Sequence, residues 1–211
     1  MHLYTCTCRT GGYSDLAKRT IVKRESLKDI SDGIDFSILY DFVRVMKKIN
    51  CFIWCSKLQI LDVMNYFAKT DINYEILVWC KTSNTWLPDI EYCLYFREKG
   101  VKLNDGYDIK HKYYVQGINK MDKDLYGHPT IKPLKIVKNH LLHTTQKNDI
   151  ILDPFSGSGT SCVAGKEIGR RFLGFELDKN YYKVSIDRLN GTDKNGQMSI
   201  FTDFEMFRRI L

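Results

Sequence analysis

Residues 149–160 read Asp-Ile-Ile-Leu-Asp-Pro-Phe-Ser-Gly-Ser-Gly-Thr. The apolar residues at the start of this stretch predict a buried strand, and the run from Thr160 to Ile168 predicts a helix. Glycines in the turn between them adopt backbone dihedrals that other residues avoid, and they let the backbone approach a ligand closely. The helix start behind them offers free N–H groups to an electron-rich group. The stretch therefore predicts a strand, a ligand-binding turn and a helix.

The rest of the chain alternates between apolar strand-like runs and helix-like segments. Strands are predicted at 3–5, 51–55, 74–79, 91–96 and 171–176, and helices at 36–49, 58–68, 131–143 and 178–189. This alternation indicates an α/β fold, with a mostly parallel, twisted sheet covered by helices on both faces. Such sheets bind ligands at the carboxyl ends of their strands. We therefore expect the glycine turn after Leu152 and the loop after Thr5 to be neighbours in space.

Composition indicates one globular domain over residues 1–211, since 44% of the residues are hydrophobic. No apolar run approaches the roughly 20 residues that a membrane span needs, and the first residues lack the pattern of a signal peptide. A cytoplasmic protein without membrane contact is expected. The seven cysteines lie mostly in apolar segments, as at Cys51, Cys55, Cys80 and Cys93. They are predicted to be reduced hydrophobic residues, and their spacing does not indicate a metal site.

The charge of the chain favours a polyanionic partner. Net charge is +7, from 32 Lys and Arg against 25 Asp and Glu. Basic residues gather at 18–19, 23–24, 110–112 and 132–138. Solvated helix and loop faces explain the same clusters equally well, so charge alone does not distinguish the two interpretations.

Two further motifs accompany the glycine turn. His128-Pro-Thr-Ile-Lys-Pro-Leu134 precedes it, and Gly174-Phe-Glu-Leu-Asp-Lys-Asn-Tyr-Tyr182 follows it. Together with Asp153–Thr160, these motifs closely resemble those of the DNA methyltransferases that modify exocyclic amines, at N6 of adenine or N4 of cytosine. Their order, with the catalytic half before the cofactor half, resembles the β class of this family and its compact versions in phages and mobile elements.

The resemblance implies a Rossmann-like methyltransferase fold that binds S-adenosylmethionine. The implied cofactor-binding residues are Asp153, Phe155, Gly157, Gly159, Thr160, Glu176, His128 and Lys132. Glu176 would bind the ribose hydroxyls, and Lys132 or the backbone of residues 128–130 would bind the carboxylate end. Simpler roles stay open: a strand-end helix cap for Glu176, an N-terminal turn for His128 and a solvated helix position for Lys132.

The resemblance also implies double-stranded DNA as the partner. Residues 98–127 form a predicted loop-rich insertion and occupy the position of a target-recognition segment in this family. Their mixture of Lys, His and Tyr suits a surface that contacts bases. A solvated loop with aromatic contacts is the alternative interpretation. Methylation of RNA or of a small molecule, and assembly as a homodimer, also stay open.

The stretch Tyr4–Gly12 departs from the family pattern. Members of the family have Asp, Asn or Ser there, followed by two prolines and an aromatic residue, whereas this chain reads Tyr-Thr-Cys-Thr-Cys-Arg-Thr-Gly-Gly. A thiol accepts hydrogen bonds weakly, so Cys6 and Cys8 are poor substitutes, and no catalytic residue is assigned. The chain is predicted to be either a methyltransferase of impaired activity or an inactive protein that binds the cofactor or DNA.

Overall fold

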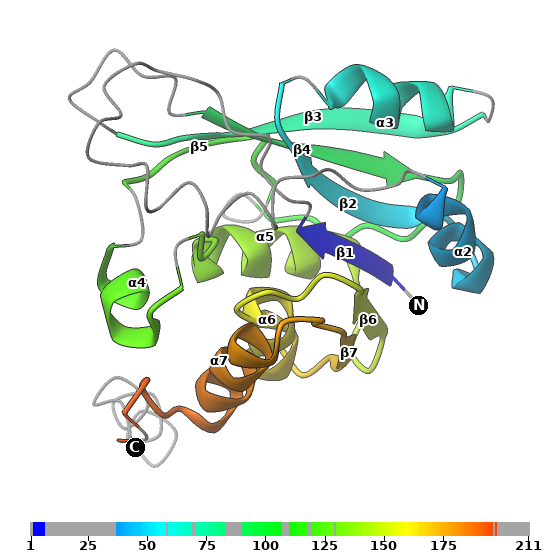
Figure 1. Ribbon diagram of the computed structural model, residues 1–211. Coiled ribbons are helices and arrows are strands. Elements are labelled where there is room, and N and C mark those ends of the chain that lie inside the picture. The colour runs from blue at the N-terminus through cyan, green and yellow to red at the C-terminus, as the bar shows by residue number, and fades with distance from the viewer. Residues whose placement is uncertain are drawn as a thin grey trace.

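A computed structural model describes residues 2–6 (backbone), 37–57, 59–68, 71–82, 90–106, 110–117, 120–128, 130–195 and 197. Its centre is a seven-stranded sheet in the order β5-β3-β4-β2-β1-β6-β7 (Figure 1). The strands are β1 (His2–Cys6), β2 (Asn50–Cys55), β3 (Asn73–Cys80), β4 (Ile90–Arg97), β5 (Tyr113–Val115), β6 (Ile150–Asp153) and β7 (Arg171–Gly174).

The sheet is mostly parallel, as predicted. Only β4 among the described strands runs antiparallel to its neighbours, β2 and β3. β1 lies in the middle and pairs in parallel with β2 on one side and with β6 on the other. The register joins Leu3 to Leu152, which places the carboxyl end of β1 beside the glycine turn and confirms that prediction for the strand itself. Residues 7–36, into which the loop after Thr5 continues, lie outside the described residues.

Helices cover both faces of the sheet, again as predicted (Figure 1). They are α2 (Ile38–Val45), α3 (Ile60–Phe67), α4 (Lys120–Tyr126), α5 (Leu134–Thr144), α6 (Thr160–Glu167) and α7 (Lys179–Asn190). The alternation of side chains along β2 shows the two layers, because successive residues of a strand point to opposite faces. Cys51 and Ile53 pack in the core with α2 and α3, whereas Phe52 and Trp54 pack in the core with α5 and α6.

Several boundaries differ from the predicted ones for local reasons. The helix predicted at 131–143 begins at Leu134, because Pro133 takes the extended N-cap position with φ −62° and ψ 123°. The helix predicted at 36–49 ends at Val45, where Met46 turns extended with ψ 138°. The strand predicted at 171–176 ends at Gly174, which leaves Glu176 in the connection to α7.

The prediction of a loop-rich segment at 98–127 is wrong in part, because this segment contains the short strand β5 and the helix α4. β5 extends the sheet by pairing in parallel with β3. Sequence periodicity misses both elements, because β5 has three residues and α4 buries none of its seven. α4 is instead held by contacts with α7, described below.

The cysteines of the apolar segments pack as hydrophobic residues, as predicted. Cys51, Cys55 and Cys93 are buried free thiols, and Cys80 is half-buried. Burial raises the pKa of Cys55 to about 12, so this thiol stays neutral. Within the described residues no group of His, Cys, Asp and Glu has the arrangement of a metal site. No described helix is long and apolar enough to cross a membrane.

Candidate cofactor-binding site

The glycine turn has the backbone conformation that its sequence predicts. Gly157 and Gly159 have φ values of +52° and +72°, in the left-handed region that other residues rarely adopt. Gly159 is also the N-cap residue of α6. A Cβ atom added to Gly159 would lie 3.0 Å from Cβ of Ser185 on α7. The turn thus needs glycine at 159 for its dihedral angles and for the close approach of α7.

The carboxylate of Glu176 reaches from the end of β7 to this turn. Its Oε2 accepts a hydrogen bond of 2.7 Å from the backbone N–H of Gly157, and its Oε1 accepts one of 2.9 Å from Asp178. The cap of α7 is Asp178, whose Oδ1 accepts from the backbone of Asn180 and Tyr181. The residue that caps α7 is therefore mainly Asp178, and not Glu176 as the alternative interpretation had it. Glu176 places a negative charge beside the turn.

Asp153 fixes the start of the turn from inside the protein. It is buried, its Oδ1 accepts from the backbone N–H of Phe155 at 3.1 Å, and its Oδ2 accepts from the hydroxyl of Ser161. Burial, with a smaller contribution from the charge of Glu176, raises the pKa of Asp153 from 3.8 to about 7, against these two hydrogen bonds. Asp153 therefore shapes the turn and does not face solvent.

His128 borders the same turn. Its imidazole is buried, lies 4.3 Å from the ring of Tyr181, and accepts a 3.2 Å hydrogen bond at Nδ1 from the backbone of Thr130. Its Nε2 lies 3.5 Å from the position of a Cβ on Gly157. Burial, followed by the positive charge of Arg188, lowers the pKa of His128 to about 4, so the ring is neutral near pH 7. His128 thus forms a local turn and borders the glycine turn, and its role toward a cofactor stays a prediction.

Lys132 is neither solvated nor in a helix. It precedes α5, it is buried, and its Nζ forms an ion pair of 2.7 Å with Oε2 of Glu91. The same ammonium group lies 5.3 Å from the ring of Trp54. Glu91 also pairs with Lys81, which in turn lies over Trp79 at 4.9 Å. We call Lys81, Glu91 and Lys132 the lysine–glutamate cluster; sequence analysis gave no indication of it.

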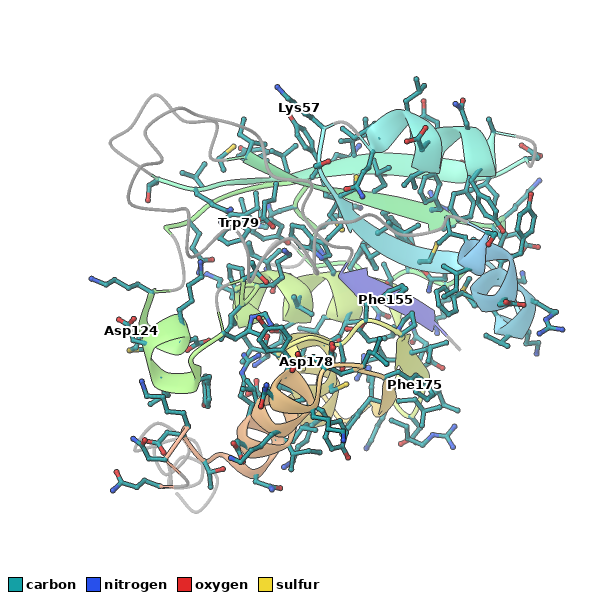
Figure 2. All side chains as sticks on the ribbon, viewed as in Figure 1. Lys57, Trp79, Asp124, Phe155, Phe175 and Asp178 are labelled. Carbon is teal, nitrogen blue, oxygen red and sulfur yellow. The ribbon has the colours of Figure 1, made fainter. Side chains whose placement is uncertain are left out.

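Phe155 and Thr160 occupy the two ends of the turn. The ring of Phe155 meets the ring of Phe42 on α2 edge to face at 5.8 Å, so it lies between the turn and the opposite layer. Figure 2 labels Phe155 on the turn after β6, and Phe175 and Asp178 on the connection from β7 to α7. Thr160 is buried at the first turn of α6. The structure thus brings seven predicted residues together around one turn, and Lys132 lies in the neighbouring cluster.

Three residues of α7 contact this site and were not among the predicted site residues: Tyr181, Ser185 and Arg188. The hydroxyl of Ser185 donates to the carbonyl of Gly157 at 2.7 Å. Arg188 is buried and donates to the carbonyl of Ser158 at 2.7 Å. The positions recur at helical spacing, which could have shown that they share one face. An arginine in the last turn of a polar helix looks like a surface residue, however.

In the two basic clusters that the structure describes, 110–112 and 132–138, most lysines pair with acidic side chains. Lys110 and Lys112 form exposed ion pairs with Asp105 and Glu75, and Lys138 pairs with Glu167. The clusters at 18–19 and 23–24 lie outside the described residues, as does the end of the Tyr4–Gly12 stretch. The catalytic half of the predicted site therefore stays a prediction.

The strand order, the single antiparallel strand among those described, and the glycine turn at the switch point define a Rossmann-like fold of the S-adenosylmethionine-dependent methyltransferase class. A family model described as DNA methylase, N6_N4_Mtase, matches residues 15–187. The chain belongs to this family.

Curated relatives match a limited part of the chain. A type II methyltransferase of Lactococcus lactis subsp. cremoris, M2.LlaDCHI, is 42% identical over 89 residues, which are 42% of this chain and 33% of that protein. M2.DpnII of Streptococcus pneumoniae is 39% identical over 93 residues, or 44% of this chain and 35% of that protein. The matches thus span about a third of the length of these relatives.

Solved structures resemble the chain over most of its length. A complex of M1.HpyAVI with SAM has a TM-score of 0.61 at 22% identity, and the match covers 89% of this chain and 88% of that one. The PvuII cytosine-N4-specific DNA methyltransferase has a TM-score of 0.58 at 16% identity, with 100% and 85% covered. At these identities the similarity supports the fold.

Proposed function

We propose that this protein binds S-adenosylmethionine at the glycine turn and transfers its methyl group to an exocyclic amine in double-stranded DNA, at N6 of adenine or N4 of cytosine. The observation that carries the proposal is the carboxylate of Glu176, held 2.7 Å from the backbone of Gly157 at the carboxyl ends of β6 and β7. An acid in this place suits a pair of ribose hydroxyls, because it can accept hydrogen bonds from both.

The residues around Glu176 fit the rest of such a ligand. Phe175 is 58% exposed and Leu177 is 98% exposed, so apolar surface is available beside the carboxylate for a flat purine ring. Phe155 adds a partly exposed ring at the other end of the turn. His128 is neutral and adds no positive charge next to the sulfonium centre that the cofactor would bring. Asp153 and Thr160 would act by holding the turn in shape.

Two residues have indirect roles in this proposal. Lys132 already faces Glu91, so its contribution to the carboxylate end of the cofactor depends on that ion pair. The backbone at 128–130 is the alternative group for the same end, and the hydrogen bond from Thr130 to His128 orients it. The residues around the glycine turn would hold the cofactor, which would supply an activated methyl group when bound.

DNA is the proposed substrate because the family is one of DNA methylases and the net charge is +7. A role in a restriction-modification system, in a cytoplasmic or phage setting, is part of the same proposal. The impaired or inactive alternative rests on the Tyr4–Gly12 stretch, and no described residue favours it. Direct transfer from the donor to the amine needs no covalent enzyme intermediate.

The experiment combines calorimetry with a transfer assay. We expect heat on titration of the wild-type protein with S-adenosylmethionine and none for Gly157→Asp, which puts a side chain with a negative charge at a positive φ and beside Glu176. Transfer is measured by mass spectrometry of nucleosides released from incubated double-stranded DNA, with single-stranded RNA as the control. Methyladenine or methylcytosine from the DNA supports the proposal.

The outcomes separate the parts of this proposal. Equal heat for both proteins would contradict the placement of the cofactor at the glycine turn. Binding by the wild type without any methylated nucleoside, on a DNA pool that contains all short sequences, would support the inactive alternative.

A further inference from the structure

Side chains on one face of α7 contact the glycine turn. Tyr181, Ser185 and Arg188 are four and three residues apart, so they lie on the same side of the helix. Tyr181 contacts His128, and Ser185 binds the carbonyl of Gly157. Arg188 contacts the next part of the turn. The face therefore contacts the turn and the segment that precedes α5 at the same time.

Arg188 makes the most extensive of these contacts. Its side chain is buried, and Nη1 donates to the carbonyl of Ser158 at 2.7 Å, to the hydroxyl of Ser158 at 3.1 Å and to the hydroxyl of Thr160 at 2.8 Å. The carbonyl of Ser158 lies between two glycines, where the backbone alone fixes little. A buried guanidinium group that gave up these acceptors would lose hydrogen bonds that water cannot replace.

The other side of the guanidinium group faces α4. Its Nη2 lies 3.7 Å from Oδ2 of Asp122, and its central carbon, Cζ, lies 5.2 Å from the ring centre of Tyr126. Both partners come from the helix at the end of residues 98–127, far from the turn in sequence. These contacts orient the planar group, so its donors are directed at Ser158 and Thr160 before a ligand arrives.

We propose that Arg188 is a positioning residue for the cofactor: through Ser158 and Thr160 it holds the glycine turn in the shape that receives the ligand. The identity of the ligand rests on the proposed function. Because Arg188 also contacts α4, the shape of the glycine turn depends on α4, which precedes the turn in the sequence. Arg188 itself touches no ligand, because it lies behind the turn, on the side of α7.

Calorimetry with S-adenosylmethionine tests this role in the full chain. We expect Arg188→Met to weaken cofactor binding by about tenfold, because the hydrogen bonds of a buried charged group are lost. Arg188→Lys keeps the charge without the planar fork, and we expect about threefold weaker binding. The matched control is Lys183→Met on the same helix, whose cation is 66% exposed and pairs with Asp187. This control keeps wild-type affinity.

The methyl-transfer assay supplies a readout that a loss of stability alone would not produce. We expect the KM for the cofactor to rise in Arg188→Lys while kcat at saturating cofactor and the KM for DNA stay unchanged. A fall in kcat with an unchanged KM for the cofactor would overturn the proposal. Thermal unfolding of the ligand-free variants is measured as well, so that weaker binding caused by partial unfolding is recognised.

Failure of this inference differs from failure of the proposed function. If the wild type gives no heat with the cofactor, the proposed function is contradicted. If the wild type binds and Arg188→Met binds equally well, the positioning role alone is overturned. Should Arg188→Met not fold, Arg188→Lys decides: wild-type affinity overturns the role, and weaker affinity in a folded protein supports it.

Discussion

The cofactor site and the lysine–glutamate cluster hold their polar groups in different ways. On the cofactor side, which comprises β6, the glycine turn, α6, β7 and α7, side chains bind backbone atoms of the turn, as Glu176 and Arg188 do. On the other side, the lysine–glutamate cluster joins side chains to one another beside two tryptophan rings. The first arrangement specifies the shape of a loop, whereas the second pairs opposite charges inside the protein.

This difference predicts which property a substitution in each region changes first. Hydrogen bonds to a loop backbone act on the shape of the loop, so their loss appears first in ligand affinity. Buried ion pairs carry a large desolvation cost, so removal of one partner appears first in stability. The following predictions separate the two kinds of effect.

The largest effect is expected on the cofactor side, from Gly159→Ala. Its φ of +72° disfavours any side chain, and the new Cβ would lie 3.0 Å from Cβ of Ser185. Together these terms cost about 3 kcal/mol of unfolding free energy, and α7 moves away from the turn. We expect no measurable heat with S-adenosylmethionine, together with a lower midpoint in urea unfolding.

Gly169→Ala is the matched control. Gly169 has a φ of +68°, but nothing lies within 4 Å of the added Cβ. This variant carries the conformational cost alone, about 1 to 2 kcal/mol, and keeps its cofactor affinity. If both variants lose the same stability and bind the cofactor equally, contact with α7 is not what requires glycine at 159.

The same contrast explains how much could be predicted from sequence. The strand and the turn lie within a short stretch, and local periodicity and glycine placement predicted them. The alternation of strand-like and helix-like runs predicted the α/β sheet with helices on both faces, and Glu176 was implied by the resemblance of its motif to a known family. The lysine–glutamate cluster joins positions 81, 91 and 132, and no local pattern shows that these meet. Lys132 was predicted to bind the cofactor, with a solvated helix position as the alternative, and its burial excludes the alternative.

Arg188 and α4 were missed for a related reason. A polar helix with no buried residue has no apolar face from which to predict it, and α4 is held largely by a charge on another helix. The antiparallel direction of β4 also has no sequence signature, because a strand buried on both faces looks apolar whichever way it runs. Such features depend on contacts between distant segments.

The next effect falls on stability rather than on cofactor binding and is expected from the lysine–glutamate cluster. Glu91→Gln removes the negative charge between two lysines that are each 7% exposed, so we expect a loss of about 3 kcal/mol in unfolding free energy. The matched control is Glu75→Gln on the adjacent strand β3, whose ion pair with Lys112 is exposed at 41% and 66%. Its loss stays below about 1 kcal/mol. Equal losses in urea unfolding would show that burial does not distinguish the two pairs.

The last effect depends on pH and returns to the cofactor side. Because burial raises the pKa of Asp153 from 3.8 to about 7, this carboxyl group holds a proton between these values in the folded protein but not in the unfolded chain. The contribution of Asp153 to the free energy of unfolding therefore falls as pH rises through this window, and levels off above it. The pKa of His128 is lowered to about 4 and that of His140 to about 3, so the two imidazoles act in the opposite direction.

Asp153→Asn isolates the contribution of this carboxyl group, because the two histidines are the same in both proteins. We expect the variant to gain stability relative to the wild type as pH rises from about 4 to about 7, by at most about 1.4 kcal/mol per pH unit. Urea unfolding of both proteins across this range measures the difference. Ser161→Ala extends the window upward, since the hydroxyl of Ser161 holds the pKa of Asp153 down. Parallel pH profiles for wild type and Asp153→Asn would mean that Asp153 is ionised in the folded protein throughout, and that the turn is held by a charge rather than by a neutral acid.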